Sequence, residues 1–497
     1  MKIFKLIIFL GLGIGCFTTK AKVEFNSNIN SAFEDIYKLK LPQADIIIEQ
    51  EIKSSKDNAA VYYLKSLCEI VKVFINENEK DYKKLSTNIK QNLKLIDKKA
   101  VKSPYGKFFK GQLLFFFGIT QFKFEDYFSA GSNIREAYIL LKENNKKYPD
   151  FLPNNTILGV IQTFSGTMPG YYKWLVTLFG IEPSVKEGMK TIKKISEAKL
   201  TETSEWQKFK LEARIFEGGL YNYVLHDELK AWNILDKCTE DWKINLFSSY
   251  LRASFLIKIN KNEEAIEVLS NRPKGKDYVN LEFCNYLLGV SKLSRLDENA
   301  DYYLKEYITK FKGRNYIKSA LQKLSWHYLI NGEYEKYKYY NAKINKMGYN
   351  FTDEDKQAQK SASSSYIPNI SLLRSRLLCD GGYLERALKE LENKSVKNFS
   401  ETRDKIEFNY RLGRIYQKMG KNDFAIMHYK IVIDEGQNLP HYFATSACIE
   451  TATIYELLKD TENAKKYYKK ALTFTKNKEY ENSLEQRAKA GLVRVDK

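Results

Sequence analysis

A fixed spacing of small and large side chains recurs near the end of the chain. In "NYRLGRIYQKMGKNDFAIMHYKIVI" a small residue is followed three positions later by a large one, and another small residue comes nine positions after that. The repeated positions are Leu412, Gly413, Tyr416, Gly420, Ala425, Tyr429 and Val432. Small side chains let two helices approach closely, and large ones fill the groove beside them. The spacing therefore predicts two antiparallel helices joined by a short turn.

The next segment, "ETATIYELLKDTENAKKYYKKAL", has the same offsets, and weaker copies lie upstream. The adjacent copy uses Ala452, Tyr455, Ala464, Tyr468 and Ala471. The weaker copies use Ser375, Leu378, Gly382, Ala387 and Leu391; Ala253, Leu256, Ala265 and Leu269; Gly118, Gln121, Ala130, Ile134 and Ala137; and Ser325, Tyr328 and Gly332. The last of these has the bulky Tyr337 where a small residue is expected. Shared offsets at so many places predict helix pairs along most of the chain.

These offsets resemble those of the tetratricopeptide repeat (TPR) family. The resemblance implies an all-α fold, a TPR-like α-α superhelix, which is a solenoid of antiparallel helix pairs. The first helices of the pairs line a concave face that suits a peptide or a helix of a protein partner. On that face the resemblance places Glu407, Tyr410, Arg414, Gln417, Lys418, Ser446, Ile449, Thr453, Glu456 and Leu457. These residues either form a partner-binding groove or are ordinary solvated helix residues.

Breaks in the pattern divide the chain into regions. Prolines cluster between residues 149 and 183, and the serine-rich "QKSASSSYIPN" is typical of a linker, because proline ends helices and serine favours turns. We expect a signal peptide at 1–21, an N-terminal repeat region at 22–200, a middle repeat region at 201–358, a linker at 359–369 and C-terminal TPR repeats at 370–497.

The proline- and glycine-rich stretch at 165–188 is predicted to be an inserted hairpin. Its apolar run is about half the length that a membrane-spanning helix needs. Pro183 and Ser184 are expected to open a helix, in which Gly188 permits close packing. Trp174 is expected to be a core residue, so that Trp174→Ala costs a few kcal/mol of stability. A segment at a membrane interface, with Trp174 at the headgroups, and a ligand pocket are the alternatives.

The opening residues, "MKIFKLIIFLGLGIGCFTTKAK", have the pattern of a secretory signal. A basic start is followed by a short apolar core and then by small residues. Cleavage after Ala21 is one processing route. The other is a lipobox-like "GIGC" that leaves a lipidated Cys16, although Gly13 stands where a lipobox usually has leucine. Both routes predict export to the periplasm or to an outer-membrane-associated site, with peripheral or lipid-anchored membrane association left open.

The other cysteines are expected to be small buried side chains. They are widely separated and lie in apolar helical contexts, at Cys68, Cys238, Cys284, Cys379 and Cys448. One or two disulfides remain an alternative in an oxidising compartment.

The net charge of +20 does not by itself indicate a nucleic-acid partner. Lysine far outnumbers arginine, and the basic residues alternate with glutamate and aspartate. Arginine is the residue that recognises phosphate in a two-pronged manner, so this composition favours ordinary surface charge. We therefore expect no nucleic acid among the partners.

No catalytic motif stands out in the sequence. The histidines, His226, His327, His428 and His441, have no metal-ligand spacing, and neither a phosphate-binding loop nor a nucleophile elbow occurs. We expect no catalytic residue, no cofactor and no metal, and hence no enzyme. A pair of carboxylates brought together only by the fold remains the alternative.

A second resemblance covers the centre of the chain. The stretch from "YFSAGSNIREAYILL" to "IEPSVKEGMKTI" looks like an uncharacterised group of exported TPR proteins from Bacteroidota. More distantly, the spacing of Gly159, Pro169, Gly180 and Gly188 is similar to that of the eukaryotic tetratricopeptide repeat protein 39 family. Ile181 departs from that pattern, because an aromatic residue is usual there. Neither resemblance implies a reaction.

Three functions follow from these patterns. The first is a non-catalytic scaffold for protein–protein interaction in the bacterial cell envelope. The second is a carbohydrate- or nutrient-binding protein, because tyrosine and tryptophan suit sugar stacking. The third is an enzyme with a site built between repeats.

Overall fold

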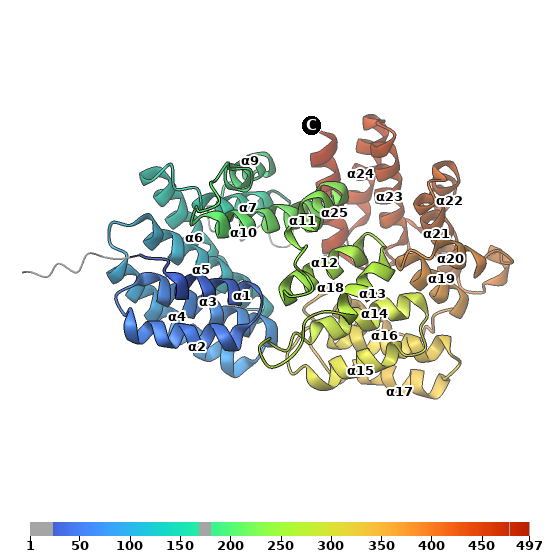
Figure 1. The fold of residues 1–497 in the computed structure, drawn as a ribbon. Coiled ribbons are helices and arrows are strands. Elements are labelled where there is room, and N and C mark those ends of the chain that lie inside the picture. Colours follow the sequence, from blue (N-terminus) through green and yellow to red (C-terminus); the bar gives the residue numbers. More distant parts are fainter. Residues whose placement is uncertain (1–22, 168–179, 477, 497) are drawn as a thin grey trace, which may run out of the picture.

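The computed structural model describes residues 23–167, 180–476 and 478–496. These ranges contain 24 α-helices, and no strand occurs in them. Consecutive helices pack in pairs, and the pairs stack into a curved array (Figure 1). The fold class predicted from the spacing, an all-α solenoid of helix pairs, is confirmed.

The first helices form the N-terminal part of the array. They are α1 (Ser27–Tyr37), α2 (Leu41–Ser54), α3 (Ala59–Asn76), α4 (Glu79–Lys99), α5 (Pro104–Lys123), α6 (Tyr127–Lys147), α7 (Asn154–Thr167) and α9 (Val185–Ser196). The predicted α5–α6 pair is present, and Gly118 explains its closeness. A Cβ at Gly118 would lie 2.8 Å from Cγ1 of Ile134, so only glycine fits there without a shift.

The packing of α7 against α9 follows from two glycines. A Cβ on Gly159 would lie 2.7 Å from the carbonyl oxygen of Gly188, and one on Gly188 would lie 2.5 Å from the backbone nitrogen of Thr163. The hydroxyl of Ser184 caps α9 by accepting a hydrogen bond from the Glu187 N–H. The predicted start of this helix and the close packing of Gly188 are confirmed. Trp174 lies outside the described residues, so its expected role stays a prediction.

The middle helices follow in the same pairwise order. They are α10 (Gln207–Gly219), the π-helix η2 (Leu220–Val224), α11 (Glu228–Cys238), α12 (Leu246–Lys258), α13 (Asn262–Ser270), α14 (Phe283–Arg295), α15 (Ala300–Lys310), α16 (Ile317–Ile330), α17 (Tyr334–Ile344) and α18 (Asp353–Ala362). The pair α16–α17 forms although Tyr337 occupies the small-residue position, and the Tyr337 side chain is buried. Residues 359–362 of the expected linker are the last turn of α18, and residues 363–369 connect it to α19.

The C-terminal helices contain the two clearest repeats. They are α19 (Ile370–Asp380), α20 (Leu384–Lys389), the short 3-10 helix η3 (Val396–Asn398), α21 (Thr402–Lys418), α22 (Asn422–Gly436), α23 (Phe443–Leu457), α24 (Thr461–Phe474) and α25 (Glu481–Val495). A Cβ on Gly413 of α21 would lie 2.6 Å from the ring of Tyr429 on α22. This contact is the close approach that the repeat spacing predicts.

The array curves back on itself. Helix α25, the last helix of the chain in Figure 1, contacts α7 and η2. The Arg494 guanidinium on α25 donates a hydrogen bond to the carbonyl oxygen of Leu225. On the opposite side, Arg314 pairs with Glu125 at 2.7 Å, which joins the middle helices to the N-terminal ones. The last helix therefore contacts elements from the first half of the chain.

Two further sequence expectations concern the membrane and the cysteines. Among the described helices, none combines the length and the apolar character that a membrane crossing requires. The five cysteines beyond residue 22 are all buried and free, in agreement with their prediction as small core side chains.

Candidate functional site

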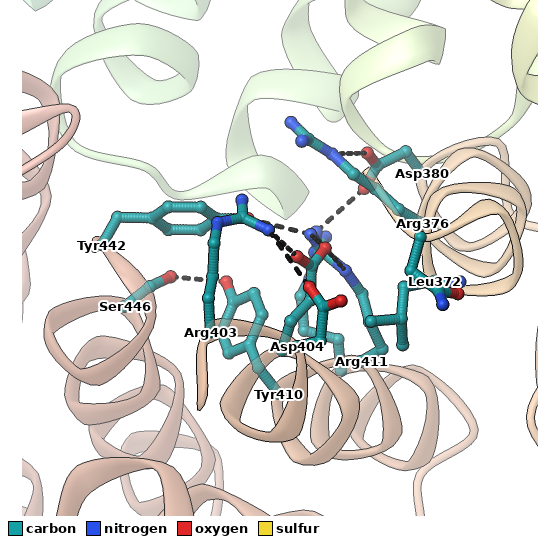
Figure 2. A network of polar contacts seen from close by, with 12 residues as sticks. Leu372, Arg376, Asp380, Arg403, Asp404, Tyr410, Arg411, Tyr442 and Ser446 are labelled. Carbon is teal, nitrogen blue, oxygen red and sulfur yellow. Dashed lines mark hydrogen bonds and ion pairs between the residues drawn. The ribbon is translucent and has the colours of Figure 1, made fainter. Parts of the chain in front are cut away.

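The inner face of the C-terminal repeats carries a cluster of arginines. Arg403, Glu407, Arg411 and Arg414 are three or four positions apart on α21, so one face of the helix presents them all. On α19, Arg376 and Asp380 have the same four-residue spacing. We call Arg376, Arg403, Arg411 and Arg414 the arginine cluster, and Figure 2 shows Arg376, Arg403 and Arg411 converging from the two helices.

Glu407 is the central carboxylate of the cluster. Its Oε2 lies 2.6 Å from Nη1 of Arg403, and its Oε1 accepts a hydrogen bond of 3.0 Å from Nε of Arg411. Burial alone would raise the pKa of Glu407, but the charges of Arg411 and Arg403 outweigh it and hold this pKa at about 2. Glu407 is therefore ionised, and it holds two guanidinium groups in place.

Asp380 is the second carboxylate, and it joins α19 to α21. Its Oδ1 lies 2.8 Å from Nη1 of Arg414, and its Oδ2 lies 3.7 Å from Nε of Arg376. Burial opposes ionisation, but Arg414 and Arg376 together lower the pKa of Asp380 to about 2. The link between the two helices is thus a permanent ion pair.

The arginines outnumber the carboxylates that pair with them. The third carboxylate, Asp404, lies 3.8 Å from Arg403, accepts a hydrogen bond of 2.5 Å from the Tyr366 hydroxyl, and has its pKa raised by burial. Arg411 is only 1% exposed, and its Nη1 is a buried donor without a hydrogen-bond partner among the described residues. Buried guanidinium donors are costly to leave unpaired, so this donor marks an unmet demand for an acceptor.

A cavity of about 200 Å³ lies beside the cluster. Its walls come from α16, α17 and α18 on one side, and from α19, α21 and the segments before α23 and α25 on the other. The guanidinium groups of Arg376 and Arg403 both reach this cavity. The cavity is thus a space between the middle helices and the C-terminal repeats, with basic side chains on one wall.

Two aromatic rings of the cavity, those of Trp326 and Tyr366, have cations over them. Nζ of Lys323 lies 3.9 Å from the ring centroid of Trp326, and the Arg403 guanidinium lies 4.2 Å from that of Tyr366. These contacts hold the cations in fixed positions. They also occupy faces of these two rings on which a sugar could otherwise stack.

The predicted concave residues on α21 lie on the same inner face as the cluster. The Tyr410 hydroxyl lies 2.7 Å from that of Ser446, which joins α21 to α23. Gln417 accepts a hydrogen bond of 2.6 Å from the Tyr429 hydroxyl, and Nζ of Lys418 donates to Oδ1 of Asn260 at 2.7 Å. Like Glu407 and Arg414, these side chains contact other parts of the chain itself.

The predicted residues on α23 are placed in three ways. Ile449 is buried, and the Thr453 hydroxyl lies 3.2 Å from that of Tyr468. Glu456 accepts a hydrogen bond of 2.7 Å from Nε of Arg494 on α25. Leu457 is 72% exposed at the end of the helix. The structure therefore brings the α21 residues and Ser446 together with the arginine cluster, whereas no hydrogen bond or ion pair of the described residues joins it to Ile449, Thr453, Glu456 or Leu457.

Sequence reasoning missed the arginine cluster itself. The segment "TRDKIEFNYRLGR" carries the signal, since Arg403, Glu407 and Arg411 follow one another at four-residue intervals. The contribution of Arg376 had no such local signal, because α19 meets α21 only in the folded chain. Within the described ranges no group of three or more histidine, cysteine, aspartate or glutamate side chains is arranged to hold a metal ion.

Comparisons with known proteins identify one repeat. The family model for the tetratricopeptide repeat matches residues 445–478, which include most of α23 and all of α24. Among the curated proteins no match to the chain was found. Similar solved structures include the APC/C hetero-tetramer Cut9-Hcn1, at 14% identity with a TM-score of 0.27, covering 92% of this chain and 95% of that chain. Another is Naa15/Naa10 bound to HypK-THB, at 14% identity with a TM-score of 0.23, covering 90% of this chain and 68% of that chain.

Proposed function

We propose that this chain is a non-catalytic scaffold that binds protein partners. The observation that carries the proposal is a group of exposed apolar side chains next to the matched repeat. Phe424 is 55% exposed, Met427 49%, Leu457 72% and Leu458 55%. Clusters of large apolar side chains on a soluble surface commonly mark sites of protein interaction.

These four residues share one edge of the array, which we call the edge patch. Helices α22 and α23 are consecutive and pack against each other, with only residues 437–442 between them. Since they run in opposite directions, the first turn of α22 and the last turn of α23 lie at the same edge. Phe424 belongs to the former, and Met427 lies three positions later on the same face of α22. Leu457 is the last residue of α23, and Leu458 follows it directly. The inner-face residues are engaged with the chain itself, which is why we place the partner at this edge.

A pair of variants tests the proposal. Purified full-length chain is used to capture partners from membrane and soluble fractions of its own cells, with quantitative mass spectrometry. We expect the double variant Leu457→Gln with Leu458→Gln to lose partners that the wild-type chain retains. The control carries Ile46→Gln with Leu211→Gln, two apolar side chains that are also exposed but lie on α2 and α10. An equal loss in both variants, or no reproducible partner, would contradict the proposal.

We further propose that the scaffold acts in the cell envelope after export. The support for this is the secretory pattern of residues 1–21 and the lipobox-like sequence that ends at Cys16. Cell fractionation with metabolic lipid labelling tests both points. Label in the wild-type chain and none in Cys16→Ser indicates a lipid anchor, and an unlabelled chain in the periplasm indicates cleavage at Ala21. Recovery of an uncleaved chain in the cytoplasm would overturn the proposal.

A further inference from the structure

The cavity beside the arginine cluster has more positive than negative charge around it. Lys360, Arg376 and Arg403 line it together with two carboxylates, Glu407 and Glu479, and Lys323 lies over the same Trp326 ring as Arg376. Within the described residues, no acidic oxygen forms an ion pair with Lys323. Burial, and to a smaller extent the charge of Arg376, lower the pKa of Lys323 to about 7. The cavity lining therefore has one more cation than it has carboxylates.

Two donors in this region are unsatisfied or weakly paired. One is the buried Nη1 of Arg411, which has no partner in the described chain. The other is the Arg376 guanidinium, whose distance of 3.7 Å to Asp380 exceeds the 2.8 Å of the Arg414 pair. The carbon atom at the centre of the Arg376 guanidinium lies 5.0 Å from the ring centroid of Trp326, so the side chain is supported from one side. A guanidinium that packs against an aromatic ring, and whose N–H groups are not all hydrogen-bonded, can donate two parallel hydrogen bonds to an oxyanion.

The size of the cavity limits what it can hold. A volume of about 200 Å³ is below the range of roughly 300–1,000 Å³ that is typical of pockets for drug-sized ligands. A peptide chain would not enter it, whereas a phosphate group with a few carbon atoms would. A phosphate monoester offers three acceptor oxygens to the guanidinium groups of Arg376 and Arg403, whereas a carboxylate offers only two.

We propose that this cavity binds a small phosphate monoester, with Arg376 of α19 and Arg403 of α21 donating hydrogen bonds to the phosphate oxygens. The site lies between the middle helices and the C-terminal repeats, so the ligand would connect two parts of the array. This proposal is independent of partner binding at the edge patch, because the cavity and the edge patch share no residue.

Isothermal titration calorimetry with the full-length chain tests the proposal. The probes are glycerol phosphate, inorganic phosphate, glycerol, acetate and a phosphoserine peptide. We expect glycerol phosphate to bind, glycerol to give no heat of binding, and acetate to bind more weakly. Tighter binding of the phosphoserine peptide, or equal binding of acetate, would overturn the assignment to a small phosphate monoester, as would the absence of binding by glycerol phosphate.

Two arginines of α19 provide a matched pair of variants. Arg376→Gln should weaken the binding of glycerol phosphate by about ten-fold or more, because the pair of hydrogen bonds from a charged guanidinium is lost. Arg374→Gln removes the same charge two residues away, where Arg374 pairs with Glu390 at 2.8 Å, and should leave binding unchanged. If Arg376→Gln does not fold, Arg376→Lys keeps the charge without the fork and should still bind more weakly. Equal affinity in the wild-type chain and a folded Arg376 variant would overturn the proposal.

Discussion

Two glutamates that are buried to the same extent have opposite ionisation behaviour. Glu212 on α10 is 3% exposed, and Glu407 on α21 is 5% exposed. Burial raises the pKa of Glu212 to about 7, and hydrogen bonds from Tyr37 and Gln112 only partly offset this rise. The pKa of Glu407 is about 2, because two arginines outweigh the same effect of burial. The partners of a buried carboxyl group, rather than its burial, determine its charge.

The N-terminal and C-terminal parts of the array differ in how they accommodate buried carboxyl groups. The N-terminal helices bury a core of aliphatic and aromatic side chains, and two neutral donors, the Tyr37 hydroxyl and the Gln112 amide, surround the carboxyl group of Glu212. The C-terminal repeats keep full charges on their inner face, and these charges connect α19 to α21. Equivalent substitutions should therefore have different effects in the two regions.

The largest expected difference is between Glu407→Gln and Glu212→Gln. Removing the Glu407 charge leaves Arg403 and the buried Arg411 without a counter-ion, which should cost about 3–5 kcal/mol of unfolding free energy. Glutamine at position 212 should cost less than about 1 kcal/mol at neutral pH, since the Tyr37 hydroxyl can turn to accept from the new amide. Urea denaturation followed by circular dichroism measures both. Equal costs would show that charge pairing does not distinguish the two regions.

The pH dependence of stability should also differ between the two regions. The folded-state pKa of Glu407 is below the ordinary glutamate value of 4.5, so its contribution to stability is present above pH 4.5 and is lost as the pH falls towards 2. The pKa of Glu212 is raised, so stability from this residue is full below pH 4.5 and is lost as the pH rises towards 7. Each of these pH changes should lower the free energy of unfolding by about 3 kcal/mol.

Hydrogen exchange at several pH values can assign these losses to their regions. Peptides of α21 should lose protection at low pH, and this loss should be smaller in Glu407→Gln than in the wild-type chain. Peptides of α10 should lose protection towards pH 7, and Glu212→Gln should reduce that loss. Profiles that are the same in wild type and variants would contradict the assignment.

A smaller effect is expected from the glycines. Gly413→Ala places a methyl group 2.6 Å from the Tyr429 ring and should cost about 1–3 kcal/mol, because the packed ring cannot move away freely. Gly219 at the end of α10 has open space around its Cβ position, so Gly219→Ala should gain about 0.5–1 kcal/mol. Thermal melts of the two variants give the comparison. Destabilisation by Gly219→Ala would show that an effect other than side-chain crowding dominates.

The smallest difference between the two regions is expected for two tyrosine hydroxyls. Tyr410→Phe should cost about 1 kcal/mol, since the Ser446 hydroxyl can rotate to a backbone acceptor on its own helix. Tyr63→Phe should cost about 2 kcal/mol, because Oε1 of the buried Gln112 then loses the donor that holds it at 2.7 Å. Urea denaturation measures both, and a larger cost for Tyr410→Phe would reverse the expected order.

Sequence reasoning found the helix pairs because their packing is encoded locally. Gly413 and Tyr429 are close in the chain, and their spacing alone predicts that they touch. The pair α14–α15 was missed although Gly289 packs on Leu304 in the same way, since its other positions depart from the pattern. The pairing of Arg414 with Asp380 spans 34 positions and two helices, so no periodicity of one helix could reveal it. Whether the predicted concave residues bind a partner depends on their surroundings, which the spacing does not specify.

The contact between α25 and η2 has a mechanical consequence. In an open array of helix pairs, small rotations at every interface add up, so the array can lengthen under tension without unfolding any repeat. Here Arg494 bonds to Leu225, 269 residues earlier in the chain. Tension applied between the N-terminal helices and α25 must break this contact before the intervening interfaces can rotate freely. The closed array should therefore resist small extensions more strongly than an open array of equal length.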